Sequence, residues 1–235
     1  MKRLLVFVMS ITLIFPVLCF GQTAVEFFNS GIYKIDLKDY NGAIADFTKA
    51  IELNPNDYEA YYNRGFSKRN LKDNYGSIAD YNKAIELNPN YDSAYNNRGL
   101  AKGMLKDYNG SIADFTKAIE LNPNYTDAYY NRGYSKKNLK DYNGAIADYT
   151  KAIEIDPNYA VAYVERGNAK IMLKDYNGAI ADYTKAIEID PNYANAYYNR
   201  GIVKSNLGKS YCRDFKKACK LGNESGCEFY NEYCK

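Results

Sequence analysis

The amino-acid sequence predicts an all-α protein in which pairs of short helices stack into an α-solenoid. The main observation is a fixed period of 34 residues, kept by five prolines and six glycines (Pro55, Pro89, Pro123, Pro157, Pro191; Gly31, Gly65, Gly99, Gly133, Gly167, Gly201). A period of this length is typical of stacked structural repeats. The second observation is that apolar residues within one period follow helical spacing.

The amino-acid composition argues against several classes of function before any motif is considered. The 235 residues are 46% hydrophobic and 25% charged, which is typical of a globular protein, and none of them is histidine. Most serine and cysteine hydrolases and most zinc sites depend on imidazole. The net charge of +3 comes with no basic run, whereas a nucleic-acid-binding protein usually shows a basic stripe. We therefore expect no enzyme activity, no cofactor, no metal site and no nucleic-acid partner.

Residues 1–21 have the order of a secretory signal peptide. Lys2 and Arg3 precede a long apolar run, and small residues follow it. Cleavage after Gly21 would leave no stable membrane span and would export the protein, in a bacterium to the periplasm, the cell surface or the medium. Disulfides form in such compartments. Retention of the run as a membrane anchor and lipid attachment at Cys19 are the alternatives to cleavage.

The second helix of each repeat is predicted from its apolar stripe and its ends. In the first repeat the stripe lies at positions i, i+1, i+4, i+7 and i+8 (Ala43, Ile44, Phe47, Ala50, Ile51). Asp39 is a suitable N-cap for this helix. Pro55 ends it, because the residue before a proline is pushed out of helical geometry.

The first helix of each repeat carries an aromatic residue four positions before the repeated glycine (Phe27, Tyr61, Tyr95, Tyr129, Tyr163, Tyr197). A glycine inside a helix costs about 1 kcal/mol relative to alanine. Its repetition predicts that another helix passes too close for a side chain. We expect this close contact over the small residues of the second helices (Ala43, Ser77, Ser111, Ala145, Ala179).

At these positions the chain resembles the tetratricopeptide repeat family. The first-helix aromatic residue, the glycine, the small residue, a second aromatic residue, an alanine and the proline keep the family's spacing over about residues 24–207. The resemblance implies that residues 22–207 hold five units (about 24–57, 58–91, 92–125, 126–159, 160–193) and the first helix of a sixth. It further implies a right-handed superhelix whose first helices line a concave face. The family binds a protein or peptide there and is not catalytic.

Two charged ladders run along the first helices, where the family often has apolar residues. Arginine recurs once per repeat, with lysine four residues later (Arg64, Arg98, Arg132, Arg166, Arg200; Lys68, Lys102, Lys136, Lys170, Lys204). They could form a track for an anionic ligand or pair with aspartates of the second helices (Asp46, Asp80, Asp114, Asp148, Asp182). We favour ion pairs, because an arginine can lay its apolar stem on the core while its guanidinium binds a carboxylate.

Residues 208–235 are predicted to form a cysteine-rich helical cap. Cys212 and Cys219 are seven residues apart, as are Cys227 and Cys234. Seven residues span about 10.5 Å of helix, too far for a disulfide within one helix. An antiparallel hairpin would instead pair Cys219 with Cys227 and Cys212 with Cys234. A zinc site would need shorter C-x₂₋₄-C spacings. The segment also resembles the Sel-like helical repeats of exported bacterial proteins.

The predicted ligand groove lies where otherwise similar repeats differ. Three positions of the first helices vary, and steps of four and three residues place them on one helix face. The turn sequence LKDYNG hardly changes, so we favour ligand binding over neutral drift. With a neighbouring row of asparagines, the groove comprises Phe28, Tyr62, Asn63, Phe66, Asn96, Asn97, Leu100, Tyr130, Asn131, Tyr134, Lys137, Asn168, Tyr198, Asn199 and Ile202.

These features predict an exported, non-enzymatic scaffold that binds an extended peptide or protein segment in the concave groove. The expected anchors are four tyrosines (Tyr62, Tyr130, Tyr134, Tyr198), because aromatic side chains supply large contact areas. The alternative function is a structural component of a cell-envelope or secretion assembly that stacks through its ends. An exposed apolar edge at residues 22–28 would favour that alternative.

Overall fold

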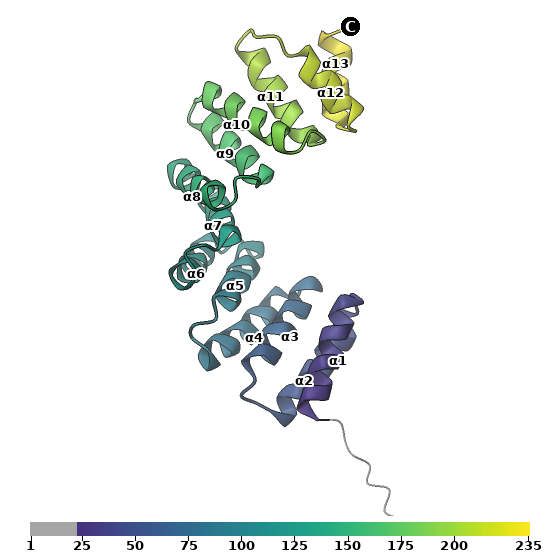
Figure 1. The fold of residues 1–235 in the computed structure, drawn as a ribbon, viewed down its shortest axis with the longest axis vertical. Helices are drawn as coiled ribbons and strands as arrows, with labels where there is room; N and C mark the ends of the chain where they lie inside the picture. The colour runs from purple at the N-terminus through teal and green to yellow at the C-terminus, as the bar shows by residue number, and fades with distance from the viewer. Residues whose placement is uncertain (1–22) are drawn as a thin grey trace, which may run out of the picture.

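The computed structural model describes residues 23–235, and the predicted signal peptide lies outside them. These residues form thirteen α-helices and no strand: α1 (Ala24–Asp36), α2 (Tyr40–Leu53), α3 (Tyr58–Asn70), α4 (Asn74–Leu87), α5 (Asp92–Met104), α6 (Tyr108–Leu121), α7 (Thr126–Asn138), α8 (Tyr142–Ile155), α9 (Ala160–Met172), α10 (Tyr176–Ile189), α11 (Ala194–Asn206), α12 (Cys212–Lys220) and α13 (Glu224–Tyr233). Consecutive helices pack in pairs along an elongated, curved array (Figure 1). The predicted all-α solenoid is confirmed.

The second helix of each of the first five pairs begins at an aspartate cap. In α2 the carboxylate of Asp39 accepts a hydrogen bond from the backbone N–H of Gly42 at 3.0 Å. A Cβ atom on Gly42 would lie 2.2 Å from this carboxylate, so glycine is needed for the close approach. The helix ends at Leu53, with Asn54 as its C-cap. Both predicted ends of this helix are confirmed.

The repeated glycine of the first helices lies against an aromatic ring of the second helices. A Cβ atom on Gly31 would lie 2.7 Å from the Phe47 ring, and one on Gly133 would lie 2.9 Å from the Tyr149 ring. The close approach was expected over the small residues instead. Their backbone is the lesser neighbour: the same Cβ atom on Gly133 would lie 3.2 Å from the carbonyl oxygen of Ala145. The glycine therefore mainly makes room for the large ring that fills each repeat.

Each arginine of the ladder joins three helices. Arg132 of α7 donates to both carboxylate oxygens of Asp148 on α8, at 2.9 and 2.7 Å, and to the hydroxyl of Thr116 on α6, at 3.1 Å. Lys136 adds a second cation to Asp148 at 2.8 Å. The other four arginines make equivalent contacts, with Asn82 in place of a threonine beside Arg98. The ion-pair interpretation is confirmed, and these guanidinium groups are not free to form an anion track.

The first repeat shows why the arginine is there. No described helix precedes α1, and Ser30 stands at the arginine position. Asp46 there accepts a hydrogen bond from Ser30 at 2.6 Å and pairs with Lys34 at 2.6 Å. The arginine thus recurs in those first helices that pack against a preceding second helix among residues 23–235.

The C-terminal helices continue the stack before closing it. α12 packs on α11 as a second helix does: Arg200 pairs with Asp214 at 2.7 Å, and Phe215 lies against Gly201. The paired residues are 14 positions apart instead of 16. The reason is that α12 begins only two residues before Asp214, whereas α8 begins six residues before Asp148. The predicted cap of residues 208–235 thus contains the second helix of a sixth pair, and α13 alone covers the end of the stack.

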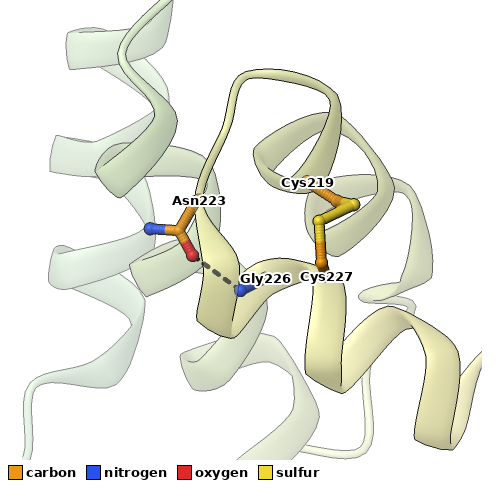
Figure 2. The surroundings of a disulfide bond; sticks show 4 residues. All are labelled: Cys219, Asn223, Gly226 and Cys227. Atoms are coloured by element: carbon orange, nitrogen blue, oxygen red, sulfur yellow. Dashed lines mark hydrogen bonds between the residues drawn. A yellow bond between two sulfur atoms is a disulfide. The ribbon is translucent and has the colours of Figure 1, made fainter.

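Two disulfides hold α13 on α12, in the predicted pairs. Cys212–Cys234 and Cys219–Cys227 have Cα–Cα distances of 5.6 and 4.4 Å. Figure 2 shows the second disulfide beside the turn, where the side chain of Asn223 accepts a hydrogen bond from the backbone N–H of Gly226 at 2.6 Å. This bond caps α13, and the disulfides prevent the last helix from separating.

Candidate functional site

The inner face of the solenoid is formed by the first helices. α1 contacts α3, α3 contacts α5, α5 contacts α7, and α7 contacts α9, in addition to the contacts within each pair. Side chains also join these helices: Asn97 donates to the Tyr62 hydroxyl at 2.9 Å, and Lys137 pairs with Glu165 at 2.5 Å. The first helices therefore form one continuous face, which neighbouring repeats build together.

Three of the four predicted anchor tyrosines are half-buried. Tyr62 packs against Tyr81 and Tyr91, with ring centroids 5.8 and 4.9 Å away, and Tyr198 lies 6.0 Å from both Phe215 and Phe229. The remaining anchors lie on α7. Tyr130 packs on Tyr149 at 5.7 Å and Tyr159 at 5.4 Å, and burial raises its pKa to about 12. Tyr134 is 46% exposed and offers its ring most fully to a ligand.

The predicted asparagines, those of the row and those at the varying positions, mostly form contacts within the protein. Asn96 and Asn97 are only 5% and 8% exposed. Asn199 donates to Asn168 at 3.3 Å, and Asn168 also accepts a hydrogen bond from the buried Tyr183 hydroxyl at 2.7 Å. These amides position the first helices relative to one another. Asn131 is the asparagine of the row that reaches the cavity described below.

The other predicted residues occupy separate stretches of the face. Phe28 stacks edge-on against Phe47 at 5.6 Å, and Asn63 donates to the Glu59 carbonyl oxygen of its own helix at 2.8 Å. The Arg69 guanidinium lies over the Phe66 ring at 5.5 Å, as the Lys137 ammonium lies over the Tyr134 ring at 4.9 Å. Ile202 is half-buried on α11. These residues line the array from end to end and do not converge on one point.

Some of the predicted groove residues line a single cavity. It lies between α5 and α7, has a volume of about 380 Å³ and is lined mainly by apolar atoms. Four predicted residues reach it: Leu100 from α5, and Tyr130, Asn131 and Tyr134 from α7. Phe115 of α6 also lines it and is buried. The cavity is therefore a recess in the inner face at the junction of the third and fourth repeats.

The sequence-based prediction did not include the other residues that line this cavity. These are Gly99, Gly103, Met104, Lys106, Tyr108, Ser111 and Ser135. Gly103 was the available signal, because it is a glycine within a helix at one of the varying positions. The remaining residues could not have been identified, since they belong to a turn and to helix faces that repeat without clear variation.

Within residues 23–235, no cluster of three or more histidine, cysteine, aspartate or glutamate side chains could hold a metal ion. No helix in this range is long and apolar enough to cross a membrane. The chemistry that the inner face offers is contact through aromatic, aliphatic and amide groups.

Family models match most of the chain. One model, described as "TPR repeat", matches residues 34–68, 69–106 and 167–208. Two models described as "Tetratricopeptide repeat" match residues 93–125, 126–159 and 148–181. Together they run without a gap from residue 34 to 208. The chain belongs to the tetratricopeptide repeat family. Tetratricopeptide repeats are typically protein-interaction modules, which agrees with an inner face built for contact.

Solved tetratricopeptide repeat structures share this arrangement of helices. MamA is 27% identical, with a TM-score of 0.67 over 74% of this chain and 96% of its own. YrrB, described as having an unusual peptide-binding site, is 24% identical, with a TM-score of 0.64 over 76% of this chain and 93% of its own. A protein from Parabacteroides merdae is 24% identical, with a TM-score of 0.64 over 88% and 83%. No curated protein matches this sequence.

Proposed function

We propose that this protein is an exported, non-enzymatic scaffold that binds an extended peptide or protein segment along its inner face. The cavity between α5 and α7 carries the proposal. It is an apolar recess in the face where the repeats differ, and the exposed ring of Tyr134 stands at its side. An apolar recess beside an exposed aromatic residue is what an anchoring contact needs. YrrB shares the fold and has a peptide-binding site, but at 24% identity it supports only the fold.

Two observations support export. The first residues have the order of a signal peptide, and the C-terminal helix is held by two disulfides. Disulfides persist in oxidising compartments and are rare where thiols are kept reduced. A protein with a structural disulfide pair at its end is therefore suited to the periplasm, the cell surface or the medium.

Site-specific photo-crosslinking tests groove binding in the organism that makes the protein. A photoreactive phenylalanine analogue replaces Tyr134 in one variant and Tyr75 in another. Tyr75 is the matched control, because it is 76% exposed but lies at the start of α4, away from the cavity. We expect position 134 to capture a defined protein that position 75 does not. Capture from position 75 alone would move the binding surface to the outer side.

The affinity for the captured partner provides the second measurement. We expect Tyr130→Ala combined with Tyr134→Ala to weaken binding at least about tenfold, which corresponds to about 1.4 kcal/mol. Tyr75→Ala should leave the affinity unchanged. Unchanged affinity of the double variant, with an unchanged circular dichroism spectrum, would contradict binding at this part of the groove.

The alternative, a structural component that stacks through its ends, has one supporting observation. Val25 on α1 is 66% exposed at the N-terminal end of the stack. Against it, Glu26 stands where later repeats bury an alanine completely, as at Ala60 and Ala94. A carboxylate at this contact opposes the packing of a preceding helix, and α13 covers the other end. Sedimentation velocity over a hundredfold concentration range tests stacking, which would give a rising sedimentation coefficient that Val25→Asp abolishes.

A further inference from the structure

The cavity between α5 and α7 exists because one side chain is missing. At the matching position of the other first helices the residues are Ile35, Arg69, Lys137, Ile171 and Ser205, and in α5 the residue is Gly103. A glycine inside a helix costs about 1 kcal/mol relative to alanine. Packing explains this cost at Gly99, where a Cβ atom would lie 2.9 Å from the Phe115 ring. It does not explain it at Gly103.

The surroundings of Gly103 would accept a side chain. A Cβ atom there would meet only the Ser111 hydroxyl oxygen, at 3.3 Å, and a small shift relieves this contact. The second repeat shows the shift, because Arg69 lies opposite Ser77, whose hydroxyl donates to the Asn74 carbonyl oxygen at 2.8 Å. Ser111 donates instead to the Gly99 carbonyl oxygen at 2.9 Å. The glycine is therefore not required by the fold, and its effect is to leave the recess open.

The walls of the recess are apolar, and it is small. Leu100 and Met104 line one side, Tyr130 and Tyr134 the other, and Phe115 lies between them on α6. In three other repeats a tyrosine occupies the position of Phe115 (Tyr81, Tyr149, Tyr183), so here the ring on α6 carries no hydroxyl. At about 380 Å³ the cavity is at the lower end of the range of roughly 300–1,000 Å³ for ligand pockets. It suits one large side chain rather than a whole cofactor.

The charge at the rim of the recess indicates which group of a ligand would lie beside the side chain that enters the recess. Among residues 23–235, Lys106, in the turn after α5, is the only charged residue that lines the cavity. It makes no salt bridge within residues 23–235, whereas nearby Lys102 and Lys136 are paired with Asp114 and Asp148. No carboxylate lines the recess. A ligand with an acidic group next to its apolar group would therefore complement this rim.

We propose that the recess is a specificity subsite for one leucine, methionine or aromatic side chain of an extended peptide, with an aspartate or glutamate close to it in sequence pairing with Lys106. This proposal rests on the proposed function and specifies the class of peptide that the groove selects. Gly103 acts by leaving volume for the apolar side chain. Lys106 acts by its charge, so its contribution weakens as salt screens it.

A random dodecapeptide display library is the probe, selected against the disulfide-bonded protein. From the unaltered protein we expect peptides that share a large apolar residue next to an acidic one. Gly103→Ile, which places the residue of the first and fifth repeats into the recess, should weaken the binding of these peptides at least tenfold. Lys106→Gln should weaken it several-fold and flatten its dependence on salt. Ser205→Ile, the same side chain at the matching position of α11, is the control and should leave the apolar preference unchanged.

The outcomes distinguish a failure of the subsite proposal from a failure of groove binding as a whole. Peptides that bind Gly103→Ile as tightly as the unaltered protein, but lose binding with Tyr198→Ala, would overturn the subsite and leave groove binding in place. Selected peptides without a shared apolar residue would overturn it as well. A library that yields no peptide dependent on any inner-face residue would overturn the subsite and the proposed function together. Circular dichroism and thermal unfolding of each variant establish that it is folded.

Discussion

At the residue scale, the large rings beside the repeated glycine differ by a single hydroxyl group. Tyr149 and Tyr183 occupy the same position in successive repeats and are both fully buried. The Tyr183 hydroxyl donates to Asn168 at 2.7 Å, whereas the Tyr149 hydroxyl has no hydrogen-bond partner among residues 23–235. Phenylalanine stands at this position in three other repeats (Phe47, Phe115, Phe215), so the change to phenylalanine fits the space.

The two tyrosines should therefore respond oppositely to the same substitution. We expect Tyr149→Phe to raise the free energy of unfolding by about 1 kcal/mol, because a buried polar group without a partner is removed. Tyr183→Phe should lower it by about 1 kcal/mol, because a made hydrogen bond is lost. Urea unfolding followed by circular dichroism measures both. Equal effects of the two substitutions would contradict the assigned hydrogen-bonding difference.

The buried ion pairs make a second residue-scale prediction. Asp148 is buried and forms ion pairs with both Arg132 and Lys136. Asp148→Ala should destabilise the protein by about 3–5 kcal/mol, because two partly buried cations lose their partner. The matched control is Lys151→Ala on the same helix, which removes a solvent-exposed pair with Glu154 and should leave the stability nearly unchanged. Comparable decreases in the free energy of unfolding from both substitutions would show that the buried ion pairs contribute no more to stability than the exposed one.

At the scale of elements, the last two helices depend on their disulfides. The Cys212–Cys234 bond closes the longer loop, with a sequence separation of 22 against 8 for Cys219–Cys227. Chain entropy predicts about 3.4 kcal/mol for the longer loop and about 2.6 kcal/mol for the shorter one. Replacing Cys212 and Cys234 by serine should thus lower the melting temperature of the C-terminal end more than replacing Cys219 and Cys227.

Hydrogen exchange read by mass spectrometry locates this effect. In either double-serine variant, amide protons of α12 and α13 should exchange faster, while those of α1 to α4 keep their protection. The reason is that each repeat contacts only its neighbours, so stability is lost locally. Faster exchange throughout the chain would show instead that the solenoid unfolds as one cooperative unit. Non-reducing peptide mapping verifies the two disulfide pairs.

At the scale of the whole molecule, the many buried tyrosines predict alkaline unfolding. Burial raises the pKa values of Tyr81, Tyr149 and Tyr183 above the ordinary value of 10.0. The folded protein therefore keeps these phenolic protons at a pH where the unfolded chain releases them. Their contribution to stability is complete below about pH 10 and is lost as the pH rises further, by about 1.4 kcal/mol per pH unit for each tyrosine.

Urea unfolding at pH 8, 9, 10 and 11 tests this expectation. The free energy of unfolding should be nearly constant up to about pH 9.5 and then fall. A triple variant with phenylalanine at positions 81, 149 and 183 should show a shallower fall, because three buried phenol groups are gone. Some fall should remain, because the half-buried tyrosines are still present. An identical fall in the triple variant would assign the alkaline sensitivity to groups other than these rings.

The sequence by itself determined the architecture, because the residues within each repeat determine where its two helices begin and end. The aspartate cap at Asp39, the stop at Pro55 and the repeated glycine act within one helical hairpin, and copying the hairpin copies its contacts. The pairing of arginines with aspartates and of the cysteines also followed, since residues at a fixed separation on adjacent helices meet in every copy. The family resemblance supplied the expected direction of the inner face.

Only the tertiary structure decided which side chains of that inner face are buried and where the face has a recess. Asn97 is buried because it bonds to Tyr62, a residue 35 positions away in the neighbouring repeat. The recess at Gly103 is bounded by three helices and by a turn lysine that no periodic pattern singles out. The physical reason is that helix periodicity specifies which way a side chain points, whereas burial and cavities depend on the volumes of side chains from separate repeats that share one space.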